Sequence, residues 1–178
     1  NDDAHAQARI MEVLVSSGLE TEAAGTRITV MRGSVSDRDY GLSIDAFDAL
    51  AGQIDAVIHG AAEVSWIKPY RRLRGSHVVG TRNAIRLACR LRIKPLYVVS
   101  TLAVCYVPDG PDVVDETTNM APYVARMPLG YAQAKCVGES LLRTVAARGL
   151  PVGILRSALI CGHSRSGSSN HQDLISRL

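Results

Sequence analysis

Short apolar runs rich in β-branched residues alternate with longer amphipathic patterns along this chain, and this alternation limits its possible folds more than any other feature. The short runs predict strands over residues 26–33, 55–62, 95–101 and 151–162. Apolar residues at helical spacing predict helices over residues 3–19, 43–52, 69–91 and 131–148. Because strands joined by helical crossovers lie parallel, the sequence predicts an α/β fold built on a parallel sheet.

Local signals mark several element ends. Ser43 is the expected N-cap of the second helix, and Gly18 and Gly149 are expected to stop the first and the last. Residues 108–128 are rich in proline and acidic side chains and are predicted to form a loop. The segment after residue 162 begins as a Gly/Ser-rich loop and ends like the start of a helix.

Bulk properties indicate a single soluble domain over residues 1–178. A net charge of +3, without a zinc-finger or RNA-binding motif, argues against nucleic acid as a partner. No apolar run approaches the roughly 20 residues that span a membrane, and nothing resembles a signal peptide. The cysteines form no C-x-x-C pair and have apolar neighbours, which predicts buried, reduced thiols and a cytoplasmic location. They are Cys89, Cys105, Cys136 and Cys161.

The sequence GYAQAK, residues 130–135, places Tyr131 and Lys135 one helical turn apart on the same face. A tyrosine exchanges protons near neutral pH only if its pKa falls well below about 10, and a nearby ammonium group lowers it. Thr101 ends an earlier buried strand, and strand ends are where open α/β sheets bind ligands. The three side chains therefore predict a site that protonates a carbonyl oxygen, although the Tyr-Lys spacing alone also fits a solvated helix start.

Several segments, in this order, resemble the thioester reductase domains that end nonribosomal peptide and polyketide synthetases and carboxylic acid reductases. These domains belong to the extended short-chain dehydrogenase/reductase superfamily. The segments are VIHGAAEVSW (57–66), PYRRLRGSHVVGT (69–81), VVSTLAV (98–104), GYAQAKCVGESLL (130–142), GLPVGILRSALICGHSRSG (149–167) and DLISRL (173–178). The resemblance implies a doubly wound, Rossmann-like parallel sheet. It further implies that this chain is the central part of the domain, without the first strands and the C-terminal substrate lobe.

The resemblance also implies roles for individual residues. Thr101, Tyr131 and Lys135 match the catalytic triad: Tyr131 donates the proton, Lys135 lowers its pKa and binds the nicotinamide ribose, and Thr101 holds the carbonyl oxygen. The cofactor is expected to be NADPH. The residues expected to bind it are His59, Gly60, Ala61, Ala62, Ser100, Tyr131, Lys135, Ser157, Ala158 and Ile160. No metal site is expected.

The implied activity is NADPH-dependent reductive release of an acyl or peptidyl thioester as an aldehyde, with further reduction to the alcohol as the alternative outcome. The implied partner is a carrier protein bearing a phosphopantetheine thioester, within a larger multidomain chain. Lys68, Arg71, Arg72 and Arg74 are either a solvated helix face or a contact for that partner. Trp66 either lines the substrate entrance or packs under the next helix.

Some residues depart from the family pattern. No glycine-rich phosphate loop is present, Ser34 replaces an aspartate, His77 replaces the asparagine before V-x-G-T, and Ser157 replaces a proline. Two alternatives therefore stay open. One is another extended short-chain enzyme, such as an epimerase or dehydratase of nucleotide sugars. The other is a non-catalytic remnant that has lost its affinity for cofactor.

Overall fold

The computed structural model describes residues 3–19 and 27–169. The chain divides into two compact units, one formed by Gly33–Ala158 and the other by Asn1–Arg32 together with Leu159–Leu178. The larger unit contains the sheet and all the predicted site residues except Ile160, which belongs to the smaller unit.

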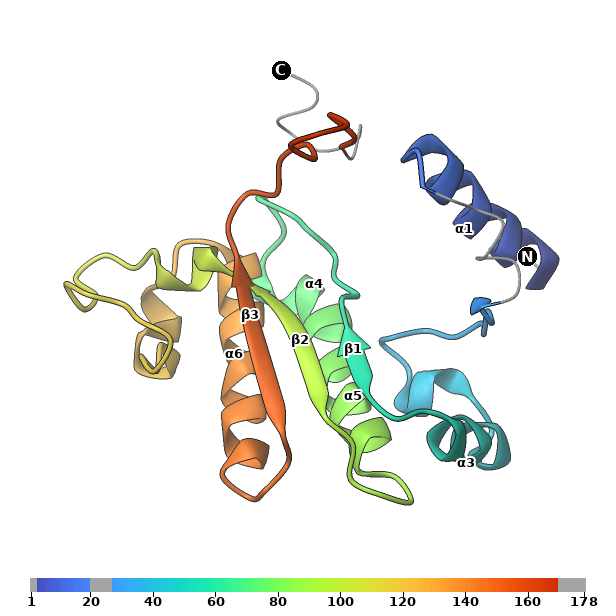
Figure 1. Ribbon diagram of the computed structural model, residues 1–178. Coiled ribbons are helices and arrows are strands. Elements are labelled where there is room, and N and C mark those ends of the chain that lie inside the picture. The colour runs from blue at the N-terminus through green and yellow to red at the C-terminus, as the bar shows by residue number, and fades with distance from the viewer. Residues whose placement is uncertain (1–2, 20–26, 170–178) are drawn as a thin grey trace. The chain divides into compact units, whose positions relative to one another are not determined.

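A three-stranded parallel sheet forms the centre of the larger unit (Figure 1). Its strands are β1 (Val57–His59), β2 (Leu96–Thr101) and β3 (Val152–Ser157), in the order β1-β2-β3. The register aligns His59 with Val98, and Thr101 with Ser157, so β2 and β3 end level with each other. The predicted parallel α/β sheet is confirmed, with shorter first and last strands than the sequence suggested.

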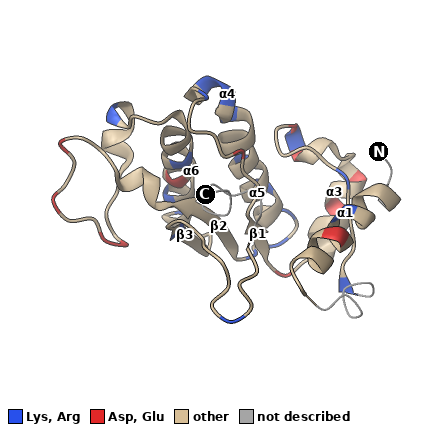
Figure 2. Ribbon diagram, turned by 90° about the horizontal axis from the view of Figure 1, so that it is seen from above, with Lys and Arg blue, Asp and Glu red and all other residues tan. Residues whose placement is uncertain are grey.

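Two helices, α5 (Gly80–Cys89) and α6 (Gly130–Ala146), lie on one face of this sheet (Figures 1 and 2). On the opposite face, the side chains of Ile58, Tyr97 and Leu155 are 76%, 44% and 54% exposed. Alternate residues of a strand point to opposite faces, so the strands bury one set of side chains and expose the other. Within the described residues, helices therefore cover a single face of a Rossmann-like sheet.

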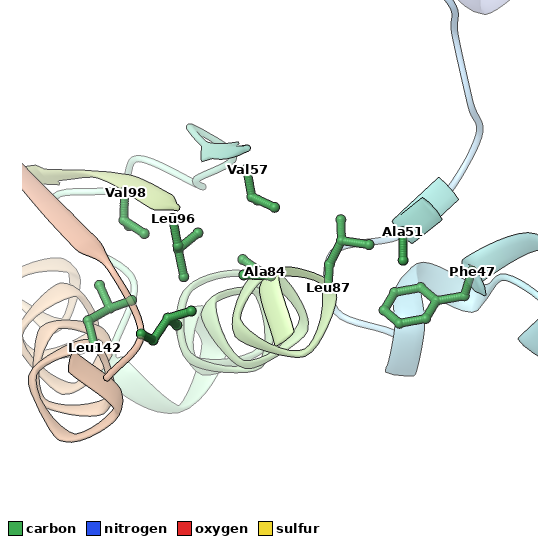
Figure 3. Close-up of a cluster of buried hydrophobic side chains, with 10 residues drawn as sticks. Phe47, Ala51, Val57, Ala84, Leu87, Leu96, Val98 and Leu142 are labelled. Atoms are coloured by element: carbon green, nitrogen blue, oxygen red, sulfur yellow. The ribbon is translucent and has the colours of Figure 1, made fainter. Parts of the chain in front are cut away.

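The main core lies between the strands and these helices and continues between α5 and the helix α3 (Ile44–Gln53) (Figure 3). Its buried side chains are Phe47, Ala51, Val57, Ala84, Leu87, Ala88, Leu96, Val98, Leu142 and Leu150. Ala84 and Ala88 are fully buried, and such small side chains let a helix backbone lie close to the sheet. Burial of each of the larger side chains contributes about 1.5–3 kcal/mol.

The helix predicted over residues 69–91 exists but changes geometry midway. The helix α4 (Tyr70–Arg74) leads into a π-helical turn, η2 (Gly75–Val79), which continues as α5. Thr81 Oγ1 donates a hydrogen bond to the His77 carbonyl at 2.7 Å. Such π turns occur mostly as single turns inside α-helices, often at functional sites. The spacing of apolar residues does not reveal this one.

At the amino end of the sheet, Lys94 closes α5. Its side chain is fully buried, and Nζ donates to the carbonyls of Leu87, Arg90 and Arg92 at 3.3, 2.6 and 3.0 Å. A lysine ammonium has three N–H donors, so the protein uses them all. Carbonyls at a helix C-terminus carry partial negative charge, which favours a cation there.

The other predicted helices are confirmed, with slightly different ends. The helix α1 (Asp3–Ser16) stops before Gly18, and α3 (Ile44–Gln53) is capped by Ser43 Oγ, which accepts from the Ala46 N–H at 3.2 Å. Gly149, just after α6, has φ of +98°, the left-handed backbone typical of a glycine stop. The helix start expected near the end of the chain lies outside the described residues.

Two expectations were wrong. Residues 27–33 form no strand, because none of the three strands pairs with them and an unpaired strand leaves its backbone groups to water. Of the four free cysteines, only Cys136 is buried, whereas Cys89 and Cys161 are exposed.

The predicted loop over residues 108–128 contains a short 3-10 helix, η4 (Ala121–Arg126). Two other short 3-10 helices are η1 (Arg38–Gly41) and η3 (Leu102–Cys105).

Candidate active site

Tyr131 lies in the first turn of α6, where the backbone around α4 fixes the start of the helix. A Cβ atom at Gly130 would lie 2.4 Å from the Tyr70 backbone nitrogen, so this contact requires glycine. The half-buried Tyr131 ring packs edge-on against the His77 ring, with the ring centres 5.4 Å apart. Three elements, α4, η2 and α6, therefore hold the phenol in place.

Thr101, the last residue of β2, meets Tyr131 at the carboxyl end of the sheet. Its hydroxyl oxygen accepts a hydrogen bond from the Ala103 N–H at 3.1 Å and so caps η3. The Thr101 hydroxyl also lies close enough to the Tyr131 phenol to lower its pKa. Two hydroxyl groups from separate elements thus converge where one carbonyl oxygen could contact both.

Lys135 lies one turn after Tyr131, buried between α6 and the sheet. Its Nζ donates to the Val99 carbonyl at 2.7 Å and lies 6.0 Å from the centre of the Tyr131 ring. Burial lowers the pKa of Lys135 to about 8, and the nearby Glu139 carboxylate opposes that shift. Within the described residues this is the one hydrogen bond of the ammonium group, so two N–H donors remain for a ligand.

The electrostatics of Tyr131 differ from the sequence prediction. Burial raises the pKa of the phenol, and the nearby Thr101 hydroxyl opposes this only in part. In this structure the net shift of the Tyr131 pKa is therefore upward, because desolvation outweighs the effects that lower it. A phenol with a raised pKa keeps its proton at neutral pH, which suits a proton donor rather than a base.

The end of β1 supplies the space beside these groups. Gly60, Ala61 and Ala62 follow the strand and are exposed, and their small side chains permit close approach of a flat ligand. His59 instead points to the helix side, with its ring against Gly80, and is 7% exposed. Burial, Lys135 and His77 lower the pKa of His59 to about 4, so the ring is neutral. The three small residues fit the predicted cofactor-binding role, whereas His59 lies beneath them.

Beneath the site lies a buried network of hydrogen-bonded charges. The sequence did not predict two of its members, Glu139 and Arg156. Ser100 Oγ donates to Glu139 Oε1 at 2.6 Å, and Arg156 donates to the same carboxylate with a shortest distance of 2.7 Å. Ser100 is 3% exposed, and its side chain ties β2 to α6 through this bond to Glu139. Glu139 lies one turn after Lys135, and a carboxylate at that spacing among apolar residues was the available signal.

The end of β3 completes the edge. Ser157 is half-buried, with Oγ donating to the Ser100 carbonyl at 3.3 Å, and Ala158 is exposed beside it. Both residues therefore lie at the carboxyl end of the sheet, beside Thr101. Ile160 is exposed within the smaller unit.

Other sequence candidates are placed elsewhere. Arg71, Arg72 and Arg74 are exposed on α4, around the buried Leu73. The basic part of α4 is blue in Figure 2. Trp66 is 62% exposed, so it does not pack under the following helix. A hollow of about 590 Å³ lies beyond β3, lined by Leu102, Cys105, Val114, Asp115, Glu116, Leu142, Arg143, Ala146, Val152, Ile154 and Arg156. None of the predicted site residues lines it.

The described residues contain neither a metal-binding cluster nor a membrane-spanning helix. Across residues 3–19 and 27–169, no group of His, Cys, Asp and Glu side chains is arranged to hold a metal ion. In the same ranges, no helix combines the length and apolar character needed to cross a bilayer.

Comparison with known proteins identifies the family. The NAD-binding family described as "Male sterility protein" matches residues 1–178. The chain belongs to this family. It is 37% identical to glycine betaine reductase ATRR of Emericella nidulans over 96% of this chain and 14% of that protein. It is 33% identical to the non-canonical nonribosomal peptide synthetase FrzA of a Cladobotryum species over 99% of this chain and 18% of that protein.

A solved structure shows the same architecture. The terminal R domain of the myxalamid polyketide and nonribosomal peptide pathway is 40% identical, with a TM-score of 0.91. The match covers 99% of this chain and 45% of that one. This member of the family therefore has the fold of part of a reductase domain, and it spans less than a fifth of the two curated relatives above.

Proposed function

We propose that this chain is the central part of one NAD(P)-binding reductase domain, residues 1–178, which reduces a carrier-bound acyl or peptidyl thioester with NADPH. The observation that carries the proposal is the convergence of Thr101, Tyr131 and Lys135 at the carboxyl end of a parallel sheet. The names of the relatives, a reductase and a peptide synthetase, support the same class of reaction.

The residues around the triad fit a nicotinamide cofactor. Gly60, Ala61 and Ala62 offer an exposed edge without bulky side chains, and Lys135 has unused N–H donors for ribose hydroxyls. Ser157 and Ala158 border the same edge from β3. When bound there, the cofactor supplies a hydride.

The chain's own side chains handle the oxygen and its proton. As the thioester carbonyl carbon accepts a hydride, negative charge develops on the oxygen, and the hydroxyls of Thr101 and Tyr131 stabilise it by hydrogen bonding. Tyr131, kept protonated by its raised pKa, donates its proton to that oxygen. The Lys135 cation, one turn away, stabilises the phenolate that remains.

The bonds and electrons balance for a two-electron reduction. A C–H bond forms at the carbonyl carbon and the proton from Tyr131 forms an O–H bond, which gives a hemithioacetal. As the C–S bond breaks and the C=O bond reforms, the O–H proton passes to the sulfur, so the pantetheine thiol leaves and the aldehyde is released. A proton from solvent restores Tyr131. One thioester, one hydride and one proton thus give one aldehyde and one thiol. A second hydride and proton would give the alcohol at the same site.

The proposed partner is a carrier protein within the same cytoplasmic multidomain chain. A thioester substrate must be presented to the exposed end of the sheet, and the exposed arginines of α4 lie on the element that packs against the start of α6. A carrier protein's phosphopantetheine arm carries a phosphate that such cations attract. The relative named as a nonribosomal peptide synthetase, of which this chain covers 18%, supports a larger chain of this kind.

The proposal is tested on the full polypeptide that contains this chain, by NADPH oxidation with an acyl-pantetheine thioester. Tyr131→Phe is expected to lower the thioester-dependent rate by at least about 100-fold. Tyr106→Phe is the matched control, because Tyr106 is 68% exposed. Equal rates in the two variants, or oxidation that does not require the thioester, would contradict the proposal. Reduction of a nucleotide sugar or a free carbonyl compound alone would favour another short-chain enzyme.

A further inference from the structure

One imidazole, that of His77, contacts both the loop after β1 and the start of α6. His77 Nε2 lies 2.9 Å from the Glu63 carbonyl, in the segment that follows Gly60–Ala62. The same ring packs edge-on against Tyr131, at an interplanar angle of 76°. His77 itself is 2% exposed and sits in the π turn η2. A single side chain thus connects the edge proposed for the cofactor with the proposed proton donor.

The protonation of this ring follows from its partners. A carbonyl oxygen only accepts hydrogen bonds, so Nε2 carries the proton that is donated to Glu63. Burial lowers the pKa of His77, which keeps the ring neutral, and Nδ1 then holds a lone pair. Nδ1 is buried without a hydrogen-bond partner among the described residues. A buried unpaired nitrogen is costly, by about 1–3 kcal/mol, and so calls for a functional or structural reason.

The backbone around His77 is fixed as firmly as its ring. Thr81 Oγ1 donates to the His77 carbonyl at 2.7 Å, and a Cβ atom at Gly138 of α6 would lie 3.2 Å from that same Thr81 oxygen. The π turn is therefore clamped between α5 and α6. Any shift of the His77 ring has to move Tyr131, the Glu63 segment, or both.

The residue type at this position matters for both contacts. An asparagine amide in place of the imidazole could also donate to the Glu63 carbonyl. It has no ring to pack against Tyr131. Histidine provides the donor and the ring together.

We propose that His77 is a positioning residue that sets the Tyr131 phenol relative to the cofactor-binding edge at Gly60–Ala62. The proposal rests on the proposed function, in which Tyr131 donates the proton. Its two contacts have separable consequences. The hydrogen bond to Glu63 holds the cofactor edge, and the ring contact holds and shields the phenol.

Two variants of the full polypeptide separate these contacts. His77→Phe keeps an aromatic ring beside Tyr131 but cannot donate to Glu63. It is expected to weaken NADPH binding and raise its KM about 10-fold, the value of one hydrogen bond, with kcat nearly unchanged. His77→Asn keeps a donor but removes the ring. It is expected to lower kcat up to about 100-fold, since small misplacement of a reacting group has that effect, with the NADPH KM nearly unchanged.

Two further measurements do not depend on turnover. NADPH affinity is measured directly by fluorescence titration. The phenol pKa is read by ultraviolet titration, with Tyr131→Phe identifying the signal. Loss of the ring in His77→Asn lets water reach Tyr131, so its raised pKa should fall toward the ordinary value, whereas His77→Phe should keep it raised. Thermal melting of each variant reports its stability.

The outcomes are distinguishable. The opposite KM and kcat patterns in the two variants, with the matching change in phenol pKa, would establish positioning. Equal small effects in both variants, or losses that only follow reduced melting temperature, would overturn it. If wild type binds NADPH but reduces no thioester, the proposed function fails. The affinity and phenol titrations then still decide whether His77 organises the site.

Discussion

The larger unit buries two lysines at opposite ends of its sheet, and they use their ammonium groups differently. Lys94, at the amino end, donates to three backbone carbonyls and is fully buried. Lys135, at the carboxyl end, donates to one carbonyl, and burial lowers its pKa to about 8. The same residue type is therefore a helix cap in one place and an incompletely bonded cation in the other. The unused N–H donors of Lys135, close to Thr101 and Tyr131, are what distinguish its surroundings from those of Lys94, whose donors are all used within the protein.

The strongest test of this comparison replaces each lysine by methionine in the full polypeptide. Lys135→Met should lower thioester-dependent reduction by about 1,000-fold, since the cation no longer supports proton transfer, with little loss of stability. Lys94→Met should leave the activity of the folded protein unchanged and lower the free energy of unfolding by about 2 kcal/mol, because three carbonyls lose their donor. Reduction rates and urea unfolding curves are measured for both variants. Loss of activity in Lys94→Met with normal activity in Lys135→Met would refute the assignment of Lys135 to the site.

Removal of the Glu139–Arg156 ion pair beneath the carboxyl end of the sheet should strongly lower the free energy of unfolding. Glu139→Gln leaves the Arg156 guanidinium buried without a counter-charge, and the free energy of unfolding should fall by about 4 kcal/mol. The exposed pair at the amino end, Arg92 with Asp55, is the control. Asp55→Asn should change the free energy of unfolding by less than about 1 kcal/mol, because solvent screens it. Similar losses in both variants of the full polypeptide would show that the network does not support the site.

Low pH should lower the free energy of unfolding, because His59 at the carboxyl end of the sheet is neutral in the folded protein. The pKa of His59 is about 4 when folded, against an ordinary value near 6.5, so the unfolded chain binds more protons between these values. The stability due to neutral His59 is thus present above pH 6.5 and lost as pH falls to 4, by about 3 kcal/mol. In His59→Gln, the unfolding free energy measured from pH 7 to 4 should fall less steeply. An identical slope would contradict the burial of a neutral ring.

The smallest effects concern two glycines. Gly130→Ala would force a Cβ atom against the Tyr70 backbone and should destabilise the protein by about 2 kcal/mol, with a fall in kcat from a displaced Tyr131. Gly52→Ala lies within α3 with only an ordinary contact, to Leu91 at 3.8 Å. It should stabilise the protein by about 0.5–1 kcal/mol, because alanine favours helices. Melting curves that moved in the same direction for both variants would show that the close approach at Gly130 is unimportant.

The sequence allowed prediction of those features that depend on neighbouring residues. Apolar periodicity predicted the helices, including α6 with Tyr131 and Lys135 one turn apart, and the strand ends where the site lies. Ser43 and Gly149 marked helix ends correctly. Residues 27–33 show the limit, because a strand-like pattern forms a strand only where another strand pairs with it.

Sequence alone thus determined the α/β pattern, the Tyr-Lys spacing and the run of small residues after β1, since each is set by local geometry. The tertiary structure decided which distant groups meet. It placed Ser100 on Glu139, and it set His77 between Glu63 and Tyr131. It also raised the Tyr131 pKa where the nearby lysine suggested a decrease. Burial and hydrogen bonding depend on segments far apart in the chain, and no local pattern contains that information.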